Sequence, residues 1–143
     1  MPRPFDVGVG IALMVLDDVG HVLMKKRKGA HGSGTWGFIG GWVDKTDGSL
    51  QYACVREGRE EAKLKLEPDS MQWHYNSTEL YPDMDVRTVT IFMKCKLPSG
   101  QVPKVGERDK QEGEWIWVGP DSMPKPLFAA GVKEALDKLW TIQ

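Results

Sequence analysis

The run Arg-Glu-Gly-Arg-Glu-Glu at residues 56–61 combines residue types that are suited to metal chemistry. On a helix, Glu57, Glu60 and Glu61 fall at positions i, i+3 and i+4, so they share one side. Glu57 and Glu61 share that side with apolar residues, and buried carboxylates are costly unless something neutralises them. Clustered hard oxygen donors suit Mg²⁺, which also takes substrate phosphate oxygens. The spacing therefore predicts a divalent-cation site on the inner face of a helix.

The same run has a simpler interpretation, as a solvated helix face with ordinary Arg–Glu pairs. Its surroundings favour the metal site. A glycine pair, Gly40 and Gly41, precedes the helix across a short polar loop, and a glycine-rich stretch (residues 29–41) leads into that pair. Glycine lets a backbone approach a ligand closely. A loop followed by a helix with an acidic inner face is suited to a metal-bound pyrophosphate.

Hydropathy and turn residues predict the elements that must position these groups. We expect strands over residues 7–16, 21–26, 86–97 and 114–118, and a weaker extended segment over 71–79. The stretch 29–41 is interpreted as a loop. A helix over 49–64 would be capped by Ser49, and Gly58 inside it costs about 1 kcal/mol relative to alanine. A last helix is predicted over 126–140, with an apolar stripe formed by Phe128, Val132, Leu136 and Leu139.

Composition limits the class of protein. The chain has 143 residues, 41% of them hydrophobic, and a formal net charge of −1. This balance argues against a disordered chain and against a protein that coats nucleic acid. The two cysteines, Cys54 and Cys95, form neither a disulfide framework nor a zinc motif. With no signal peptide or apolar span evident, we expect one cytoplasmic domain over residues 1–143, with no nucleic-acid or membrane partner.

The stretch from Gly40 to Leu64 resembles the Nudix box, G-x5-E-x7-R-E-u-x-E-E-x-G-u, where u is aliphatic. Arg56-Glu57 and Glu60-Glu61 carry the strongest match. The flanking sequences KRKGAHGSGTWGF, VTIFMK and EGEWIWV resemble the small MutT-like nucleoside-triphosphate diphosphatases, including the subgroup that accepts oxidised or thio-modified guanine nucleotides. The fold implied is α/β, a Nudix-type α/β/α sandwich with a mixed β-sheet.

The box departs from the family pattern at several positions. Gly41 to Arg56 is one residue longer than the pattern, so the first Glu is absent; Gly48 occupies its aligned position, and Asp44 or Asp47 lies nearby. Other differences are Gly58 for the usual aliphatic residue, Lys63 for the usual glycine, and Ile39 where many members have proline. The missing Glu puts the number of metals and the rate in question more than the fold.

The resemblance implies a role for each matching residue. Glu57 and Glu61 would be the main metal ligands, Glu60 would assist, and Gly40 would offer its backbone carbonyl. Arg56 would orient Glu57, as partners outside the metal's own ligands do. Glu112 matches a distal Glu that serves relatives as a metal ligand or base, and an ordinary loop carboxylate is an equally good interpretation of it.

Substrate contacts are implied for three further residues. Arg27 matches the family's phosphate-contacting arginine, whose planar fork suits phosphate. Gly41 and Trp42 would line the substrate site. Trp36, Phe38 or Trp42 could stack on a base, although aromatic residues more often belong to the core.

The activity implied is Mg²⁺-dependent hydrolysis of a nucleoside (deoxy)triphosphate to the monophosphate and pyrophosphate, with Mn²⁺ able to replace Mg²⁺. An oxidised or modified purine nucleotide such as 8-oxo-dGTP is one candidate substrate. ADP-ribose, a nucleotide sugar or a dinucleoside polyphosphate is an alternative substrate class. A catalytically silent nucleotide-binding module is an alternative of another kind. A homodimer is expected by family analogy alone.

Overall fold

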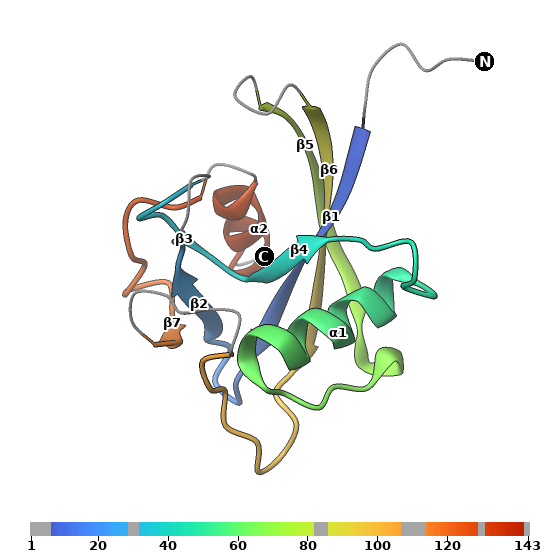
Figure 1. Ribbon diagram of the computed structural model, residues 1–143. Coiled ribbons are helices and arrows are strands. Elements are labelled where there is room, and N and C mark those ends of the chain that lie inside the picture. The colour runs from blue at the N-terminus through green and yellow to red at the C-terminus, as the bar shows by residue number, and fades with distance from the viewer. Residues whose placement is uncertain (1–6, 29–31, 82–85, 107–113, 129–130, 142–143) are drawn as a thin grey trace, which may run out of the picture.

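The computed structural model describes residues 7–28, 32–81, 86–106, 114–128 and 131–141 (Figure 1). It contains a seven-stranded mixed sheet and two helices. The strands are β1 (Val7–Leu16), β2 (Val22–Lys26), β3 (Trp36–Gly37), β4 (Ile39–Trp42), β5 (Gln72–Tyr81), β6 (Val86–Lys96) and β7 (Ile116–Val118). The helices are α1 (Leu50–Ala62) and α2 (Val132–Leu139), and a 3₁₀ turn spans Pro68–Ser70.

Strand β1 is the centre of the sheet. It runs parallel to β6 along its whole length, from Val7 opposite Arg87 to Leu16 opposite Lys96. It pairs antiparallel with β4 over residues 10–13 and with β2 at Leu16. At one end of the strand order β5 pairs with β6, and at the other end β3 pairs with β2, which also pairs with β7. A strand covered on both faces needs apolar residues at successive positions, which explains the continuous apolar run that predicted β1.

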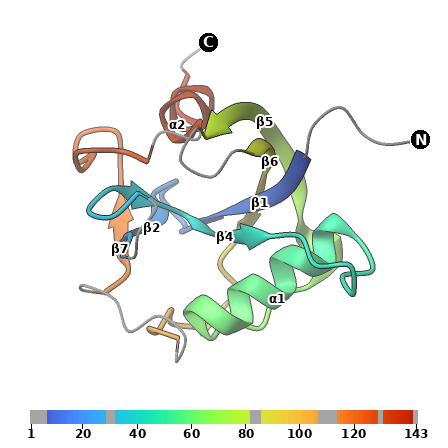
Figure 2. The same cartoon turned by 45° about the horizontal axis from the view of Figure 1, so that its top comes forward.

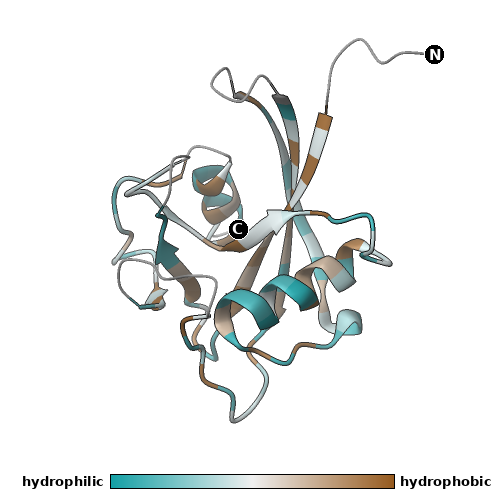
Figure 3. Cartoon of the chain, viewed as in Figure 1, coloured by the Kyte–Doolittle hydropathy of each residue, from teal (hydrophilic) through white to brown (hydrophobic). Residues whose placement is uncertain are grey.

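The two helices cover opposite faces of this sheet, as Figures 1 and 2 show. Side chains alternate across the pleat of β1, so Leu13 and Val15 pack in the core beneath α1 while Met14 packs in the core beneath α2. Cys54 belongs to the first core and Leu136 to the second. Figure 3 shows hydrophilic colour in the loop before α1 and on turns of that helix, among other places. The predicted α/β/α sandwich with a mixed sheet is confirmed.

Helix α1 matches its prediction closely. Ser49 is its N-cap, and the Ser49 hydroxyl accepts a hydrogen bond from the backbone N–H of Tyr52 at 3.2 Å. Gly58 lies mid-helix, where an added Cβ would come within 2.6 Å of Leu66 Cδ1. Glycine is unfavourable inside a helix, but a larger residue at position 58 would displace Leu66, which packs against the helix backbone.

Two predictions from the sequence are wrong in detail. The glycine-rich stretch is more than a loop, since it contains β3 and β4; at Gly40 a Cβ would come within 2.6 Å of the Ile11 carbonyl oxygen, so only glycine allows this approach. The last helix begins at Val132 rather than Pro126. Backbone hydrogen bonds of 2.9 Å join Trp36 N–H to the Pro126 carbonyl and Phe128 N–H to the Trp36 carbonyl, so the segment ending at Phe128 lies beside β3 instead.

The last strand is also shorter than predicted, because β7 begins at Ile116 rather than Glu114. Within the described ranges, no helix has the length and apolar character needed to cross a membrane.

Candidate active site

Helix α1 turns two of its carboxylates toward β4. Glu57 is only 8% exposed, and Gly41 faces it so closely that a Cβ would lie 2.7 Å from Glu57 Oε1. One turn later, Glu61 Oε2 accepts a hydrogen bond of 2.8 Å from the backbone N–H of Gly40. The glycine pair and the acidic face of the helix therefore meet.

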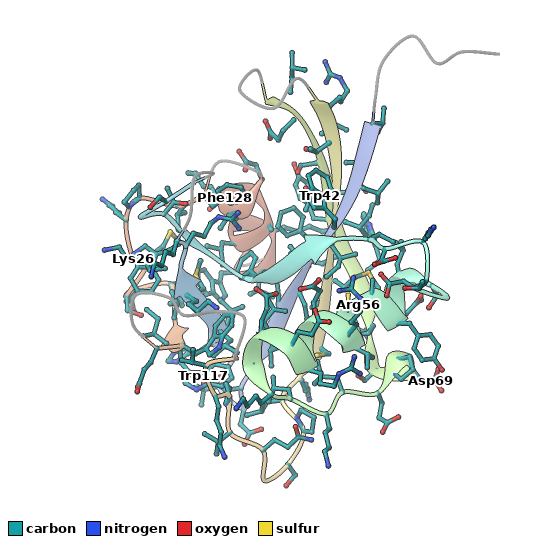
Figure 4. All side chains as sticks on the ribbon, in the orientation of Figure 1. Lys26, Trp42, Arg56, Asp69, Trp117 and Phe128 are labelled. Carbon is teal, nitrogen blue, oxygen red and sulfur yellow. The ribbon has the colours of Figure 1, made fainter. Side chains whose placement is uncertain are left out.

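The guanidinium group of Arg56 donates hydrogen bonds to several groups on this side of α1. Its Nη1 donates to Glu57 Oε1 at 2.7 Å and to Glu60 Oε2 at 3.2 Å, and its Nη2 donates to the Trp42 carbonyl at 3.1 Å. In Figure 4, Arg56 lies between α1 and β4 with carboxylate oxygens around it. These contacts have the geometry expected of a residue that orients Glu57.

Asp47 completes the Arg56 network. Its two carboxylate oxygens accept from Arg56 Nε at 2.8 Å and Nη2 at 2.9 Å, a bidentate pair. The side-chain hydrogen bonds from Arg56 lower the pKa of Asp47 from 3.8 to about 2. Asp44, the other acidic residue near the missing box Glu, instead accepts hydrogen bonds from Thr46 within the loop. The sequence could not distinguish these two aspartates, and the structure places Asp47 on Arg56.

The electrostatics of Glu57 suit a cation. Burial raises the pKa of Glu57, while the Glu61 carboxyl within hydrogen-bond reach and the Arg56 guanidinium act in the opposite direction. Two carboxyl groups that meet in a partly buried place either share a proton or bind a cation. A hard divalent ion fits this pair of oxygen donors.

Glu60 shares Arg56 with Glu57, since Glu60 Oε2 and Glu57 Oε1 both accept hydrogen bonds from Arg56 Nη1. Across the residues that the structure describes, no three His, Cys, Asp or Glu side chains gather closely enough to enclose an ion. Two facing carboxyls suffice for Mg²⁺, which keeps several waters and takes its remaining ligands from substrate phosphates.

A cavity of about 260 Å³ borders β4. Its lining comprises Gly10, Ile11, Ala12, Arg27, Gly37, Phe38, Gly40, Gly41, Trp42, Thr88, Thr90, Phe92, Phe128 and Val132. Gly40 and Gly41 belong to this wall and also contact Glu61 and Glu57, so the cavity and the carboxylates adjoin the same two residues. Concave, mainly apolar sites with a few polar groups are typical of small-molecule binding.

Arg27 and Phe128 form one end of the cavity. The Arg27 guanidinium lies 3.8 Å from the centre of the Phe128 ring, a stacked cation–π pair. Arg27 lines the cavity, and its predicted contact with substrate phosphate stays a prediction. Phe128 was assigned to the apolar stripe of the last helix, and that assignment is wrong because residue 128 precedes α2.

Thr88 and Thr90 also line the cavity, and no motif in the sequence pointed to them. They alternate with Val89 and Ile91 along β6, so they face the α2 side of the sheet together with Phe92. The alternation itself was the available signal, since it places Thr88 and Thr90 on the same face of the strand as Phe92.

Three further predicted residues have different outcomes. Trp42 lines the cavity, is 48% exposed, and lies so close to Gly8 that a Cβ there would come within 2.4 Å of the Trp42 ring. Gly40 meets Glu61 through its N–H, and a metal contact from its carbonyl stays a prediction. Glu112 lies outside the described residues.

Comparisons with known proteins agree with this geometry. The NUDIX domain model matches residues 5–139. A MutT NUDIX hydrolase from Burkholderia pseudomallei superposes with a TM-score of 0.80 at 29% identity, covering 93% of this chain and 98% of that one. The NUDIX domain of Shewanella oneidensis NrtR, solved with ADP ribose, has a TM-score of 0.71 at 19% identity and covers 96% and 87%.

A third similar structure is a bifunctional NMN adenylyltransferase/ADP ribose pyrophosphatase from Francisella tularensis, complexed with AMP and a Mn ion. It has a TM-score of 0.59 at 22% identity over 95% of this chain and 38% of that one. Nudix hydrolases generally use a divalent metal, and the carboxyl pair of α1 suits one. Because the family model spans almost all of the chain and the acidic helix and glycine pair meet as the box requires, the chain belongs to the NUDIX family and is a MutT-like hydrolase of pyrophosphate bonds.

Proposed function

We propose that the protein hydrolyses a nucleoside (deoxy)triphosphate to the monophosphate and pyrophosphate with Mg²⁺. The observation that carries this proposal is the position of Gly40 and Gly41, which line the cavity and contact both carboxylates. A nucleoside in the cavity would have its phosphates beside Glu57 and Glu61.

The proposed metal ligands are Glu57 and Glu61, with Glu60, the Gly40 carbonyl and Glu112 assisting. When bound, Mg²⁺ would neutralise phosphate charge and lower the pKa of a water ligand. Mn²⁺ would replace it, and the similar Francisella structure contains a Mn ion. Arg56 and Asp47 would keep Glu57 oriented through their hydrogen bonds.

In the proposed reaction, a water oxygen forms a bond to one phosphorus of the α,β-anhydride, and the bond between that phosphorus and the α,β-bridging oxygen breaks. The bridging oxygen stays on the other phosphorus, so the products are the monophosphate and pyrophosphate, and the water loses a proton to the carboxylate cluster and then to solvent. Arg27 would donate to phosphate from its stacked position on Phe128, since a guanidinium can stack through its face and donate at its edge.

The substrate proposal rests on the cavity. Phe128 and Trp42 offer aromatic surface to a base, and the hydroxyls of Thr88 and Thr90 offer hydrogen bonds. Any base can stack on such rings, and the resemblance to the MutT-like diphosphatases makes an oxidised or modified purine nucleotide such as 8-oxo-dGTP the leading candidate. Turnover of ADP-ribose by the same residues is the second candidate, because the similar Shewanella domain was solved with ADP ribose.

A catalytically silent nucleotide-binding module is disfavoured. The missing box Glu motivated that alternative, and Asp47 supplies Arg56 with a carboxylate partner in its place. We also propose that residues 1–143 act as one domain, as a cytoplasmic protein and as a homodimer.

The test is incubation with Mg²⁺ and a panel of nucleotides, followed by chromatography of the products. The panel holds canonical and oxidised triphosphates, ADP-ribose and dinucleoside polyphosphates. Wild-type protein is expected to release a monophosphate and pyrophosphate, and Glu61→Gln is expected to lower kcat by about 100-fold or more because a metal ligand is lost.

The matched control is Glu67→Gln, which removes an exposed carboxylate close to α1 in sequence and should leave kcat unchanged. The proposal fails if no nucleotide is hydrolysed with Mg²⁺ or Mn²⁺, or if Glu61→Gln is as active as wild type. Release of AMP and ribose phosphate from ADP-ribose alone would replace the leading substrate with the second candidate.

A further inference from the structure

The last turn of α1 carries Glu61 and ends without partners for its carbonyl groups in the helix itself, as every α-helix does. Two donors from elsewhere in the chain meet the Glu61 carbonyl. The indole Nε1 of Trp115 donates at 3.2 Å and the backbone N–H of Gly106 donates at 3.0 Å. The next carbonyl, that of Ala62, accepts from Lys104 N–H at 2.9 Å. Hydrogen bonds from outside the helix therefore fix the backbone of α1 at Glu61, the residue proposed to bind the metal.

The approach of Gly106 is unusually close. A Cβ at this position would lie 1.9 Å from the Glu60 carbonyl oxygen and 3.0 Å from the Glu61 Cα, so no other residue type fits without moving the backbone. Gly106 thus fixes the distance between its own segment and the turn that bears Glu60 and Glu61.

Trp115 is in turn held by a buried lysine. Lys25 of β2 is 5% exposed, and its ammonium nitrogen lies 4.5 Å from the centre of the Trp115 ring. Lysine is rarely this buried in proteins, and a cation over an aromatic face is stabilised by the ring quadrupole. Lys25 is two residues from Leu23, which packs in the core beneath α1. Because side chains alternate along a strand, Lys25 also lies on the α1 face of the sheet.

Glu61 is consequently fixed at both ends. Its backbone carbonyl is held by Trp115 and Gly106, and its carboxylate is held by the Gly40 N–H. The glutamate side chain has three rotatable bonds, and ordering them costs conformational entropy when a metal binds. A backbone that is already fixed beside Gly40 reduces this cost.

We propose that Trp115 is a positioning residue for metal binding: its indole N–H fixes the Glu61 backbone, and Lys25 fixes the plane of the indole. The inference rests on the proposed role of Glu61 as a metal ligand. Neither residue is assigned contact with substrate or metal.

The experiment compares Trp115→Phe with Trp117→Phe. Phenylalanine keeps an aromatic face for Lys25 and removes the N–H. Trp117 is the matched control, because it is half-buried, packs against the same core, and makes no indole hydrogen bond among the described residues. Mn²⁺ dissociation constants are measured from the signal of free Mn²⁺ in electron paramagnetic resonance, without substrate.

Trp115→Phe is expected to raise the Mn²⁺ dissociation constant by about tenfold, the lower end of the effect of losing a partner outside the metal's own ligands. Trp117→Phe is expected to change it by less than about twofold. Exchange of the Gly40 amide hydrogen, measured by NMR in metal-free protein, should also be faster in Trp115→Phe alone, because Glu61 would hold that amide less well.

Lys25 gives an independent pair of variants if Trp115→Phe folds poorly. Lys25→Met removes the cation and should weaken Mn²⁺ binding, and Lys25→Arg should restore it because guanidinium also stacks on indole. Equal Mn²⁺ affinity in all variants and wild type would overturn the inference. Glu61→Gln distinguishes failure of the proposed metal site from failure of the positioning role. If Glu61→Gln binds Mn²⁺ like wild type, the proposed metal site is wrong. If Glu61→Gln loses Mn²⁺ binding while Trp115→Phe binds Mn²⁺ like wild type, only the positioning role is refuted.

Discussion

The carboxylate network and the cavity adjoin the same short strand and are built in different ways. In the network, charged groups are tied together by short hydrogen bonds: Arg56 alone reaches Asp47, Glu57, Glu60 and the Trp42 carbonyl. In the cavity, the lining is mostly glycine, aliphatic and aromatic, and the polar groups are the two threonines and Arg27.

This difference distinguishes the residues proposed to act in the reaction from the residues proposed to select the substrate. A tightly bonded ionic network tolerates little substitution, because removing one partner leaves a buried charge uncompensated. An apolar cavity can accept a change of side chain and respond with a change of preferred ligand. Substitutions in the network should therefore lower kcat for every substrate, and substitutions in the cavity should alter KM and the ratio between substrates.

Among substitutions that leave the proposed metal ligands in place, the largest effect is expected for Arg56→Lys. Lysine keeps the charge but cannot make the bidentate bond to Asp47 while also reaching Glu57, so both carboxylates lose their fixed orientation. We expect kcat to fall by about 10- to 100-fold for all substrates, as for other partners of metal ligands. Steady-state kinetics with two different nucleotides provide the measurement.

Arg59→Lys is the control for that substitution, because Arg59 is exposed on the same helix. If Arg56→Lys lowered activity for one nucleotide and not for the other, the proposed distinction between the carboxylate network and the cavity would be wrong.

In the cavity, Phe128→Ala is expected to raise KM by about tenfold with kcat within about threefold of wild type. The lost base–aromatic contact is worth about 1–3 kcal/mol, and Arg27 loses the ring on which it stacks. The measurement is kcat and KM for a purine and a pyrimidine triphosphate.

Trp73→Ala serves as the comparison for an exposed aromatic residue away from the cavity, and should leave both constants unchanged. A large loss of kcat with KM unchanged in Phe128→Ala would place Phe128 in the chemistry instead.

The smallest effect concerns stability. The folded pKa of Asp47 is about 2, below its ordinary 3.8, because Arg56 stabilises the charged form. A lowered folded pKa stabilises the protein above the unfolded pKa, and this contribution is lost as pH falls through the folded one. The Tm of wild type should exceed that of Asp47→Asn near pH 6, and the gap should narrow between about pH 4 and pH 2.

Thermal unfolding followed by circular dichroism measures this gap, with Asp69→Asn as an exposed-aspartate control. A gap that is constant across this pH range would show that the Arg56–Asp47 pair does not stabilise the fold through its charge.

The sequence predicted the parts of the site that lie close together along the chain. Glu57 and Glu61 were placed on the inner face of α1 because helical spacing puts them beside Leu50, Cys54 and Leu64. Ser49 was found as the cap because its position before the helix follows a local rule.

Parts that depend on distant segments were missed or left open. Phe128 reads as helix from its apolar spacing, and only the pairing of residues 126–128 with β3 shows otherwise. Asp44 and Asp47 are equivalent in sequence, and the loop conformation selects Asp47. Trp115 meets Glu61 across 54 residues, a contact that no local pattern encodes.

The central claim is that the carboxylate pair and the cavity form one site around Gly40 and Gly41. The most direct test is a crystal structure with Mn²⁺ and a triphosphate whose α,β-bridging oxygen is replaced by a methylene group. The account predicts an anomalous Mn²⁺ peak at the Glu57 and Glu61 carboxylates and the base in the cavity beside Phe128. A metal elsewhere, or a base outside the cavity with the metal in place, would contradict it.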